Sequence, residues 1–231
     1  MSKQAFFVTG TDTGVGKTLV SAGLLLAARD LGLTTAALKP VAAGCEMTPE
    51  GLRNEDALLL QSVITQPLSY EQVNPVALGP AVAPHIAAQQ SRRILSVDRL
   101  AGFCRGSLGQ AQLTLVEGAG GWRVPLNPSE TLADLARQLQ LPVILVVGIR
   151  LGCISHALLT AEAIVRDGLK LAGWVANHMD PDMPVQEENV ASLVQRLPAP
   201  CIGRVPWLAR SSPQQVAAAF DPALLRDFLQ V

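Results

Sequence analysis

Residues 10–18 read GTDTGVGKT. The stretch follows the apolar run AFFVTG (5–10) and precedes a segment with apolar residues at helical spacing, at positions 19, 20, 24 and 27. The sequence therefore predicts a strand, a glycine-rich loop and a helix in direct succession. A phosphate-binding P-loop has this context, with four residues between its first glycine and a Gly-Lys-Ser/Thr ending. That glycine should stand at position 11, but Thr11 is there and Gly10 comes one residue earlier.

One extra residue lengthens the loop but leaves Gly16, Lys17 and Thr18 at the start of the helix. Backbone N–H groups around Gly14 and Gly16 would point at phosphate oxygens, and the helix N-terminus adds partial positive charge. Lys17 would bridge the β- and γ-phosphates, and the Thr18 hydroxyl would ligate Mg²⁺. The alternative is a solvated turn with an accidental Gly-Lys-Thr, which the order of strand, loop and helix disfavours.

The rest of the chain alternates short apolar runs with helical patterns. We expect further strands at 34–40, 112–118, 141–149, 169–177 and 199–205, and further helices at 52–63, 96–105, 131–140, 155–167 and 186–196. The proline-rich stretch 66–90 is expected to hold loop and a short helix after Pro84. Near-continuous apolar strands separated by helices indicate a mostly parallel sheet with helices on both faces. The expected fold is one doubly wound α/β domain of P-loop NTPase type spanning residues 1–231.

Composition and charge narrow the class of protein. Hydrophobic residues form 49% of the chain and aromatic residues only 4%, so the core should consist mostly of Ala, Val, Leu and Ile. The net charge of −1 gives no overall attraction to nucleic acid or an anionic membrane. We find neither a membrane-spanning stretch nor a separate leader segment, so a cytoplasmic protein is expected. Four scattered cysteines and three scattered histidines predict reduced thiols and no zinc site.

Ligands of a doubly wound sheet bind beyond the carboxyl ends of its strands, so the residues after each strand are the candidate site. Lys39 follows the second strand and could reach a transferred phosphoryl group, or be an ordinary surface lysine. Asp56, in the first turn of the next helix, could supply a carboxylate to Mg²⁺ or accept from the helix's own amides. Glu117 closes an apolar strand, where a carboxylate is costly unless it is paired or bound to metal. With Thr18, both carboxylates form a hypothetical Mg²⁺ site.

Two further strand ends could form a pocket for a nucleotide base. Asn177 follows the strand LAGWVAN, and Pro206 and Trp207 follow CIGRV. A side-chain amide can pair with a purine edge, and a proline can cover its face. Asn177 could equally be a turn residue and Trp207 a packing residue, and the sequence leaves both interpretations open.

Together these segments resemble the dethiobiotin synthetase family, in order and over nearly the whole chain. The resemblance rests on GTDTGVGKT (10–18), KPVAAG (39–44), GLRNEDAL (51–58), APHIAA (83–88), VEGAGGW (116–122), PVILVVG (142–148), LGCISHALLT (151–160), AGWVAN (172–177) and VPWL (205–208). The P-loop of that family has the same additional residue, so the loop here looks like a genuine variant. KPVA, VEGAGGW and LGCI in this order are far more specific than Gly-Lys-Thr alone.

The resemblance implies an ATP- and Mg²⁺-dependent ligase of biotin biosynthesis. A diamine, 7,8-diaminononanoate, would react with CO₂ to a carbamate, which attacks the γ-phosphate of ATP to form a carbamic–phosphoric anhydride. The second amine would close the ring of dethiobiotin and expel phosphate. Phosphoryl transfer depends mainly on positioning and charge neutralisation, which Lys17, Lys39 and Mg²⁺ would supply.

The family's functional residues carry over position by position. Lys39 matches the active-site lysine and acts with Lys17. The implied nucleotide-binding residues are Gly14, Val15, Gly16, Lys17, Thr18, Leu19, Asp56, Glu117, Gly118, Ala119, Gly120, Asn177, His178, Pro206, Trp207 and Leu208. The implied diamine-binding residues are Thr13, Ala43, Leu151, Gly152, Cys153 and Ile154, the last four at a helix start that suits an anion and lies near the partner in the family's homodimer.

Three positions depart from the family pattern. Ala43 stands where a serine often contacts the substrate, a loss of roughly 1 kcal/mol if nothing replaces that hydrogen bond. Arg210 stands where some members have an acidic residue, and Gly14 where some have glutamate.

The main alternative is a regulatory P-loop ATPase of the partitioning or septum-positioning type. Such proteins usually carry a second lysine near the start of the loop, but positions 11–13 are Thr-Asp-Thr, and the C-terminal PALLRDFLQV is hardly basic. An amidating ligase of the cobyrinate type would need a glutaminase domain, for which 231 residues leave no room. A nucleotide-independent binding module would leave the set of Gly16, Lys17, Thr18, Asp56 and Glu117 unexplained.

Overall fold

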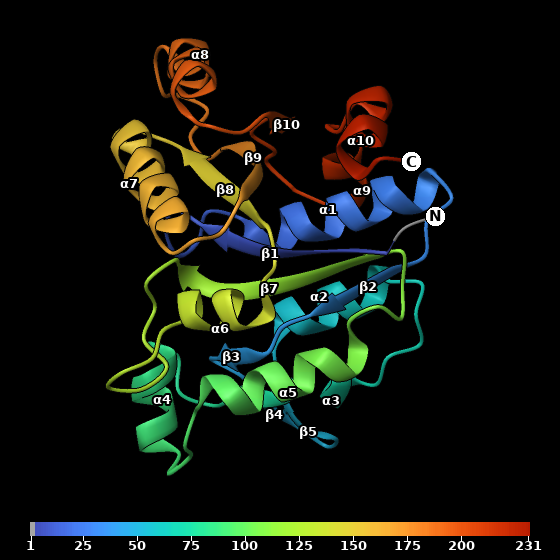
Figure 1. Ribbon diagram of the computed structural model, residues 1–231, viewed down its shortest axis with the longest axis vertical. Coiled ribbons are helices and arrows are strands. Elements are labelled where there is room, and N and C mark those ends of the chain that lie inside the picture. The colour runs from blue at the N-terminus through green and yellow to red at the C-terminus, as the bar shows by residue number, and fades with distance from the viewer. Residues whose placement is uncertain (1–2) are drawn as a thin grey trace.

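The computed structural model describes residues 3–231 and is built around six parallel strands (Figure 1). These strands are β1 (Gln4–Gly10), β2 (Thr35–Leu38), β7 (Leu113–Gly121), β8 (Val143–Ile149), β9 (Leu171–His178) and β10 (Cys201–Val205). Their order across the sheet is β10-β9-β8-β1-β7-β2, and every neighbouring pair is parallel. Since β1 lies between β7 and β8, the loop after it opens near the middle of the sheet's carboxyl edge.

Helices cover both faces of the sheet, as expected for a doubly wound fold (Figure 1). One face packs against α1 (Lys17–Asp30), α9 (Pro213–Ala217) and α10 (Pro222–Leu229). The other packs against α5 (Val97–Ser107), α6 (Leu132–Leu139), α7 (Cys153–Arg166) and α8 (Gln186–Arg196). Successive side chains of β1 alternate between these layers, with Phe6 and Val8 in the first and Phe7 in the second. This alternation buries β1 on both sides and fixes where its loop emerges.

The region after β2 contains four short strands that the sequence analysis did not predict. β3 (Val41–Ala43) pairs in parallel with β6 (Val76–Leu78), and β4 (Glu46–Thr48) forms an antiparallel hairpin with β5 (Gly51–Arg53). The chain leaves the main sheet at Lys39 and Pro40, where proline supplies no N–H for a further ladder bond. Of these strands, β3 contributes Ala42 and Ala43 to the wall of the candidate site described below.

The helix expected over 52–63 was wrong at its start. Residues Gly51–Arg53 belong to β5, and α2 (Glu55–Val63) begins after Asn54. The Asn54 side chain accepts a hydrogen bond from the N–H of Ala57 at 3.3 Å and so caps the start of α2.

The proline-rich stretch holds α3 (Tyr70–Val73), β6 and α4 (Pro84–Gln90). The short helix expected after Pro84 is therefore confirmed, whereas α3 and the C-terminal α9 and α10 were not predicted. All four cysteines are free. Within residues 3–231, no helix has the length and apolar character needed to cross a membrane.

Candidate active site

The loop between β1 and α1 has a backbone that favours glycine at two positions. Gly14 has φ 74° and Gly16 has φ 83°, both in the left-handed region. A Cβ on Gly16 would lie 2.3 Å from Nδ2 of Asn177, so no side chain fits there. Within residues 3–231, the N–H groups of Gly14 and Gly16 have no acceptor. Free amides at the start of a 14-residue helix form a cradle for an anion.

Lys17 begins α1 and is buried beside this cradle. Its ammonium donates a hydrogen bond to the carbonyl of Asp12 at 3.1 Å. Burial, with a smaller contribution from the Lys39 charge, lowers the pKa of Lys17 to about 8. A nearby anion would stabilise the charged form of this buried ammonium, and the loop amides would hold such an anion next to it.

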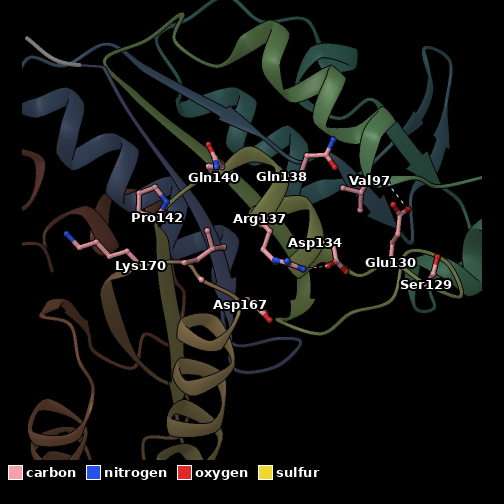
Figure 2. Close-up of a pocket in the computed structure, with 12 residues that line it drawn as sticks. Val97, Ser129, Glu130, Asp134, Arg137, Gln138, Gln140, Pro142, Asp167 and Lys170 are labelled. Atoms are coloured by element: carbon pink, nitrogen blue, oxygen red, sulfur yellow. Dashed lines mark hydrogen bonds and ion pairs between the residues drawn. The ribbon is translucent and has the colours of Figure 1, made fainter.

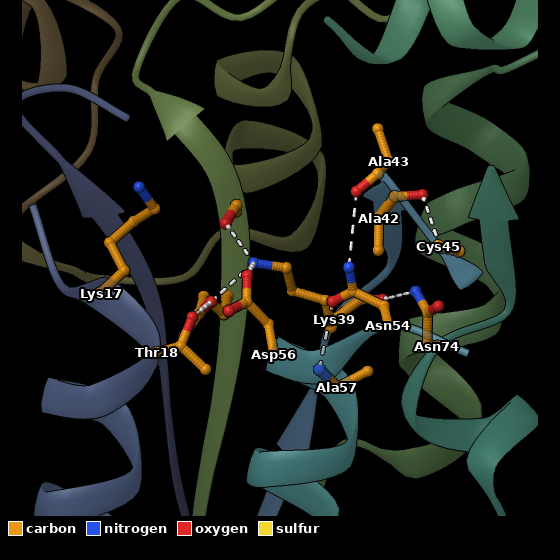
Figure 3. Close-up of polar contacts among 12 residues, drawn as sticks. Lys17, Thr18, Lys39, Ala42, Ala43, Cys45, Asn54, Asp56, Ala57 and Asn74 are labelled. Carbon is orange, nitrogen blue, oxygen red and sulfur yellow. Dashed lines mark hydrogen bonds and ion pairs between the residues drawn. The ribbon is translucent and has the colours of Figure 1, made fainter. Parts of the chain in front are cut away.

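A second group of charges lies where β2, α1, α2 and β7 meet (Figure 3). The Lys39 ammonium lies 2.6 Å from Oε1 of Glu117 and 3.0 Å from Oδ2 of Asp56. The Thr18 hydroxyl donates to the same Glu117 oxygen at 2.7 Å. The structure thus brings together the three residues predicted as metal ligands and the predicted active-site lysine.

The electrostatics of this cluster favour its charged forms. Burial would lower the pKa of Lys39, but the carboxylates of Glu117 and Asp56 outweigh it and raise that pKa above its ordinary value. Burial would raise the pKa of Asp56, but the Lys39 charge outweighs it and lowers that pKa. Lys39 therefore stays an ammonium and Asp56 a carboxylate over the whole neutral range.

The donor set of the cluster fits Mg²⁺. Oε2 of Glu117 is buried and has no hydrogen-bond partner among the described residues, so one carboxylate oxygen is left over. Asp56 is half exposed and the Thr18 hydroxyl adds a third hard oxygen. Within residues 3–231, no group of three or more His, Cys, Asp or Glu side chains could hold a metal. An ion here would need its remaining ligands from water or phosphate, as Mg²⁺ usually does.

A cavity of about 830 Å³ opens over the loop and the cluster. Its lining includes eleven residues that the sequence analysis named: Thr13, Gly14, Gly16, Lys17, Thr18, Leu19, Lys39, Ala43, Asp56, Ala119 and Gly120. It also includes residues that the analysis did not assign to the site: Ala42, Asn54, Leu59, Ala81, Val82, Ala83, Pro84, Val124 and Ser211. Positions 81–84 reach the site because β6 pairs with β3, a contact that no local pattern signals.

Other predicted nucleotide residues lie around the cavity without lining it. Asn177 is buried, and its Nδ2 donates to the carbonyl of Val15 at 2.9 Å, so it supports the backbone of the loop. Nδ1 of His178 lies 2.8 Å from the carbonyl oxygen of Val205. Trp207 is 45% exposed in the segment after β10, between exposed Pro206 and half-buried Leu208. Val15, Glu117 and Gly118 are buried and do not line the cavity.

The predicted diamine residues 151–154 also lie outside the cavity, at the start of α7. Leu151 is 94% exposed, and Gly152 has φ 92° at the N-cap. Cys153 is buried in the first turn. Arg150, immediately before this segment, forms an ion pair with Asp12, so the start of α7 is tied to the P-loop.

A second cavity, of about 890 Å³, lies at the opposite edge of the sheet, where β8 and β9 begin (Figure 2). Its carboxylates already have partners. Glu130 accepts from the N–H of Val97, Asp134 from Thr131, and Asp167 from Trp122 and Arg123. The P-loop does not line it. We therefore assign the chemistry to the first cavity, at the carboxyl edge.

Comparison with known proteins gives full-length matches. A family model described as an AAA domain (AAA_26) matches residues 4–215. The chain is 68% identical to the ATP-dependent dethiobiotin synthetase BioD of Cellvibrio japonicus over 227 residues, 98% of this chain and 100% of that protein. It is 63% identical to the protein of the same name from Pseudomonas aeruginosa, over 94% of this chain and 96% of the relative.

Solved structures confirm the fold class. The signal recognition particle receptor FtsY of Elizabethkingia anophelis matches with a TM-score of 0.56 and 14% identity, covering 99% of this chain and 64% of that one. A ParA family ATPase from Chlorobium tepidum matches with a TM-score of 0.56 and 10% identity, covering 99% and 97%. At these identities the likeness shows a P-loop NTPase fold and nothing finer. The sequence relatives, matched from end to end, show that the chain belongs to the ATP-dependent dethiobiotin synthetase family.

Proposed function

We propose that this chain forms dethiobiotin from 7,8-diaminononanoate, CO₂ and ATP, releasing ADP and phosphate. The observation that carries the proposal is a cavity lined by the P-loop cradle, Lys39 and Asp56, with the buried Glu117 carboxylate bonded to Lys39. A kinase-like transfer of the γ-phosphoryl group needs this combination of anion cradle, second cation and metal-binding carboxylates. The end-to-end relatives bearing the synthetase name support the same reaction.

The residues divide the work between binding and charge neutralisation. The amides of Gly14 and Gly16 and the ammonium of Lys17 would hold the triphosphate. Lys39, which lines the cavity, would stabilise negative charge on the transferred phosphoryl group. Thr18, Asp56 and Glu117 would hold Mg²⁺, which when bound neutralises charge on phosphate oxygens. The carbamate oxygen is already anionic, so the site needs no strong general base.

The remaining contacts follow from position around the cavity. Residues 118–120 would adjoin the phosphates, and Asn177, His178 and residues 206–208 would contact the base. Thr13 and Ala43 would contact the diamine from within the cavity. The start of α7, at 151–154, would receive the carboxylate tail of a diamine bound mainly by a partner copy, in a homodimer. We also infer that the chain forms a single domain, because the cavity draws on residues from Thr13 to Ser211. We further infer a cytoplasmic location.

The deciding experiment measures phosphate release from Mg-ATP and bicarbonate, with and without 7,8-diaminononanoate, together with the mass of the product. Release that depends on the diamine, with a ring-closed product that has gained one carbonyl and lost two hydrogens, is the expected result. Slow release indifferent to the diamine would overturn the proposal and indicate a regulatory ATPase, a class that shares this fold.

A further inference from the structure

The backbone of Lys39 is held by a turn outside the main sheet. Its N–H donates to the carbonyl of Val73 at 2.7 Å, and its own carbonyl accepts from Nδ2 of Asn74 at 2.6 Å. Both partners lie at the end of α3, and Figure 3 shows Asn74 beside Lys39. Since β2 ends at Leu38, this turn replaces the ladder bonds that would otherwise fix the lysine's backbone.

One hydroxyl joins that turn to the segment that carries Asp56. The hydroxyl of Tyr70 donates to Oδ1 of Asn74 at 3.0 Å and accepts from the N–H of Asn54 at 2.8 Å. Asn54 is the N-cap of α2, two residues before Asp56. All three polar residues of this chain of hydrogen bonds are buried: Asn54, Tyr70 and Asn74.

A second contact strengthens the tie between the two segments. Nδ2 of Asn54 donates to the carbonyl of Ala43 at 3.4 Å, in the wall of the cavity. The Arg53 guanidinium covers the ring of Tyr70, with 4.1 Å from Cζ to the ring centroid. The Arg53 guanidinium thus holds the Tyr70 ring in place. The Tyr70 hydroxyl, bonded to Asn74 and Asn54, sets the distance between the Lys39 turn and the start of α2.

We propose that Tyr70 and Asn74 are positioning residues that set the Lys39 ammonium against Asp56 and Glu117; their effect on turnover rests on the proposed function. Apolar side chains of similar size would fill the same space without burying the three polar side-chain atoms of Tyr70 and Asn74. A fully satisfied buried network rigidifies what it connects. Here one end holds the backbone carbonyl of Lys39 and the other the backbone N–H of Asn54, two residues before Asp56.

The test compares Tyr70→Phe and Asn74→Ala with a matched control, Thr65→Val. Thr65 accepts a hydrogen bond from the N–H of Thr35 at 2.7 Å, so it ties the opposite end of β2 to the segment after α2. We expect kcat to fall about tenfold or more in the first two variants, since small misplacements of a catalytic group cost that much. The KM for ATP should change less than about twofold, because the P-loop contacts remain.

The double variant provides a check on the route of the effect. If Tyr70 acts through Asn74, Tyr70→Phe combined with Asn74→Ala should lose little more kcat than the worse single variant.

The control variant Thr65→Val should lower the unfolding midpoint and keep kcat within about twofold of the wild type.

A readout that needs no ATP keeps the test separate from the proposed function. The chain has four lysines, so ¹⁵N-lysine labelling gives few ammonium signals, and Lys39→Arg assigns the one from Lys39. We expect that signal to shift or broaden in Tyr70→Phe and Asn74→Ala, and to stay unchanged in Thr65→Val.

Two results would overturn the inference: unchanged kcat in both variants, or an unchanged Lys39 signal in both. A shifted signal in a protein without diamine-dependent turnover would support the positioning and refute the proposed reaction. Should Tyr70→Phe fold poorly, Asn74→Ala carries both measurements alone.

Discussion

The ammonium of Lys39 lies 2.6 Å from a carboxylate oxygen of Glu117, a residue 78 positions further along the chain, and both side chains are buried. Each group is the main compensation for the other's desolvation. Removing one leaves the other charged and buried, which typically costs about 3–5 kcal/mol of stability. The pair therefore has a structural role beside its proposed functional one, and variants must separate the two roles.

Lys39→Ala should abolish diamine-dependent phosphate release while leaving ATP binding within roughly tenfold, since most ATP contacts lie in the P-loop. The free energy of unfolding should also fall. Combining it with Glu117→Gln should recover stability without activity, because the buried carboxylate becomes neutral. Phosphate release, nucleotide titration and chemical denaturation measure these effects. Normal turnover in Lys39→Ala would remove its catalytic role.

Glu117→Gln alone should raise the Mg²⁺ concentration needed for half-maximal turnover by about tenfold or more, since an amide is a weaker ligand than a carboxylate for this hard cation. Titration of the nucleotide complex with Mn²⁺, followed by electron paramagnetic resonance, measures metal binding directly. Glu130→Gln, in the cavity at the other edge of the sheet, is the control. Equal metal affinity in wild type and Glu117→Gln would exclude Glu117 as a ligand.

Gly16→Ala should lose most ATP binding. Its φ of 83° strains any side chain, and a Cβ would lie 2.3 Å from Nδ2 of Asn177, so the loop or the Asn177 side chain that supports it must move. Gly32→Ala separates the two effects, because Gly32 has φ 87° but no atom within 4 Å of the added Cβ. Both variants should lose about 1–2 kcal/mol from backbone strain, but only Gly16→Ala should weaken nucleotide binding. Equal nucleotide affinity in the two variants would contradict this account of the loop.

Binding of Mg-ATP should take up a proton at alkaline pH. The pKa of Lys17 is about 8 in the free protein, and the phosphates of ATP would raise it by favouring the ammonium. Affinity should therefore fall as pH rises through about 8, where the free lysine loses its charge. Calorimetry at the same alkaline pH, in two buffers of different ionisation enthalpy, counts the protons. Lys17→Arg stays charged, so the uptake should vanish; uptake that persists would assign it elsewhere.

Short-range patterns in the sequence were sufficient to predict much of the fold. The order of strand, loop and helix around residues 10–18 depends on neighbours in sequence, and β1 and α1 form there as predicted. The apolar runs that predicted β7, β8, β9 and β10 are likewise properties of short segments. Asn54 signals the start of α2 by capping chemistry alone, although the sequence analysis placed the start of that helix three residues too early.

The tertiary structure alone decided which of these segments meet. The order β8-β1-β7-β2 sets Lys39 against Glu117, and the pairing of β3 with β6 brings 81–84 to the cavity wall. The hydrogen bond from the N–H of Asn54 to the Tyr70 hydroxyl joins residues 16 positions apart, with α2 and a loop between them, and no periodic pattern in the sequence signals it. Hydrophobic periodicity indicates which face of a helix or strand is buried. It does not indicate which other element covers that face, because many different elements would bury the same apolar area equally well. The sequence by itself thus determined the P-loop and the strands of the main sheet, and packing decided the four short strands after β2 and the charge cluster beside the P-loop.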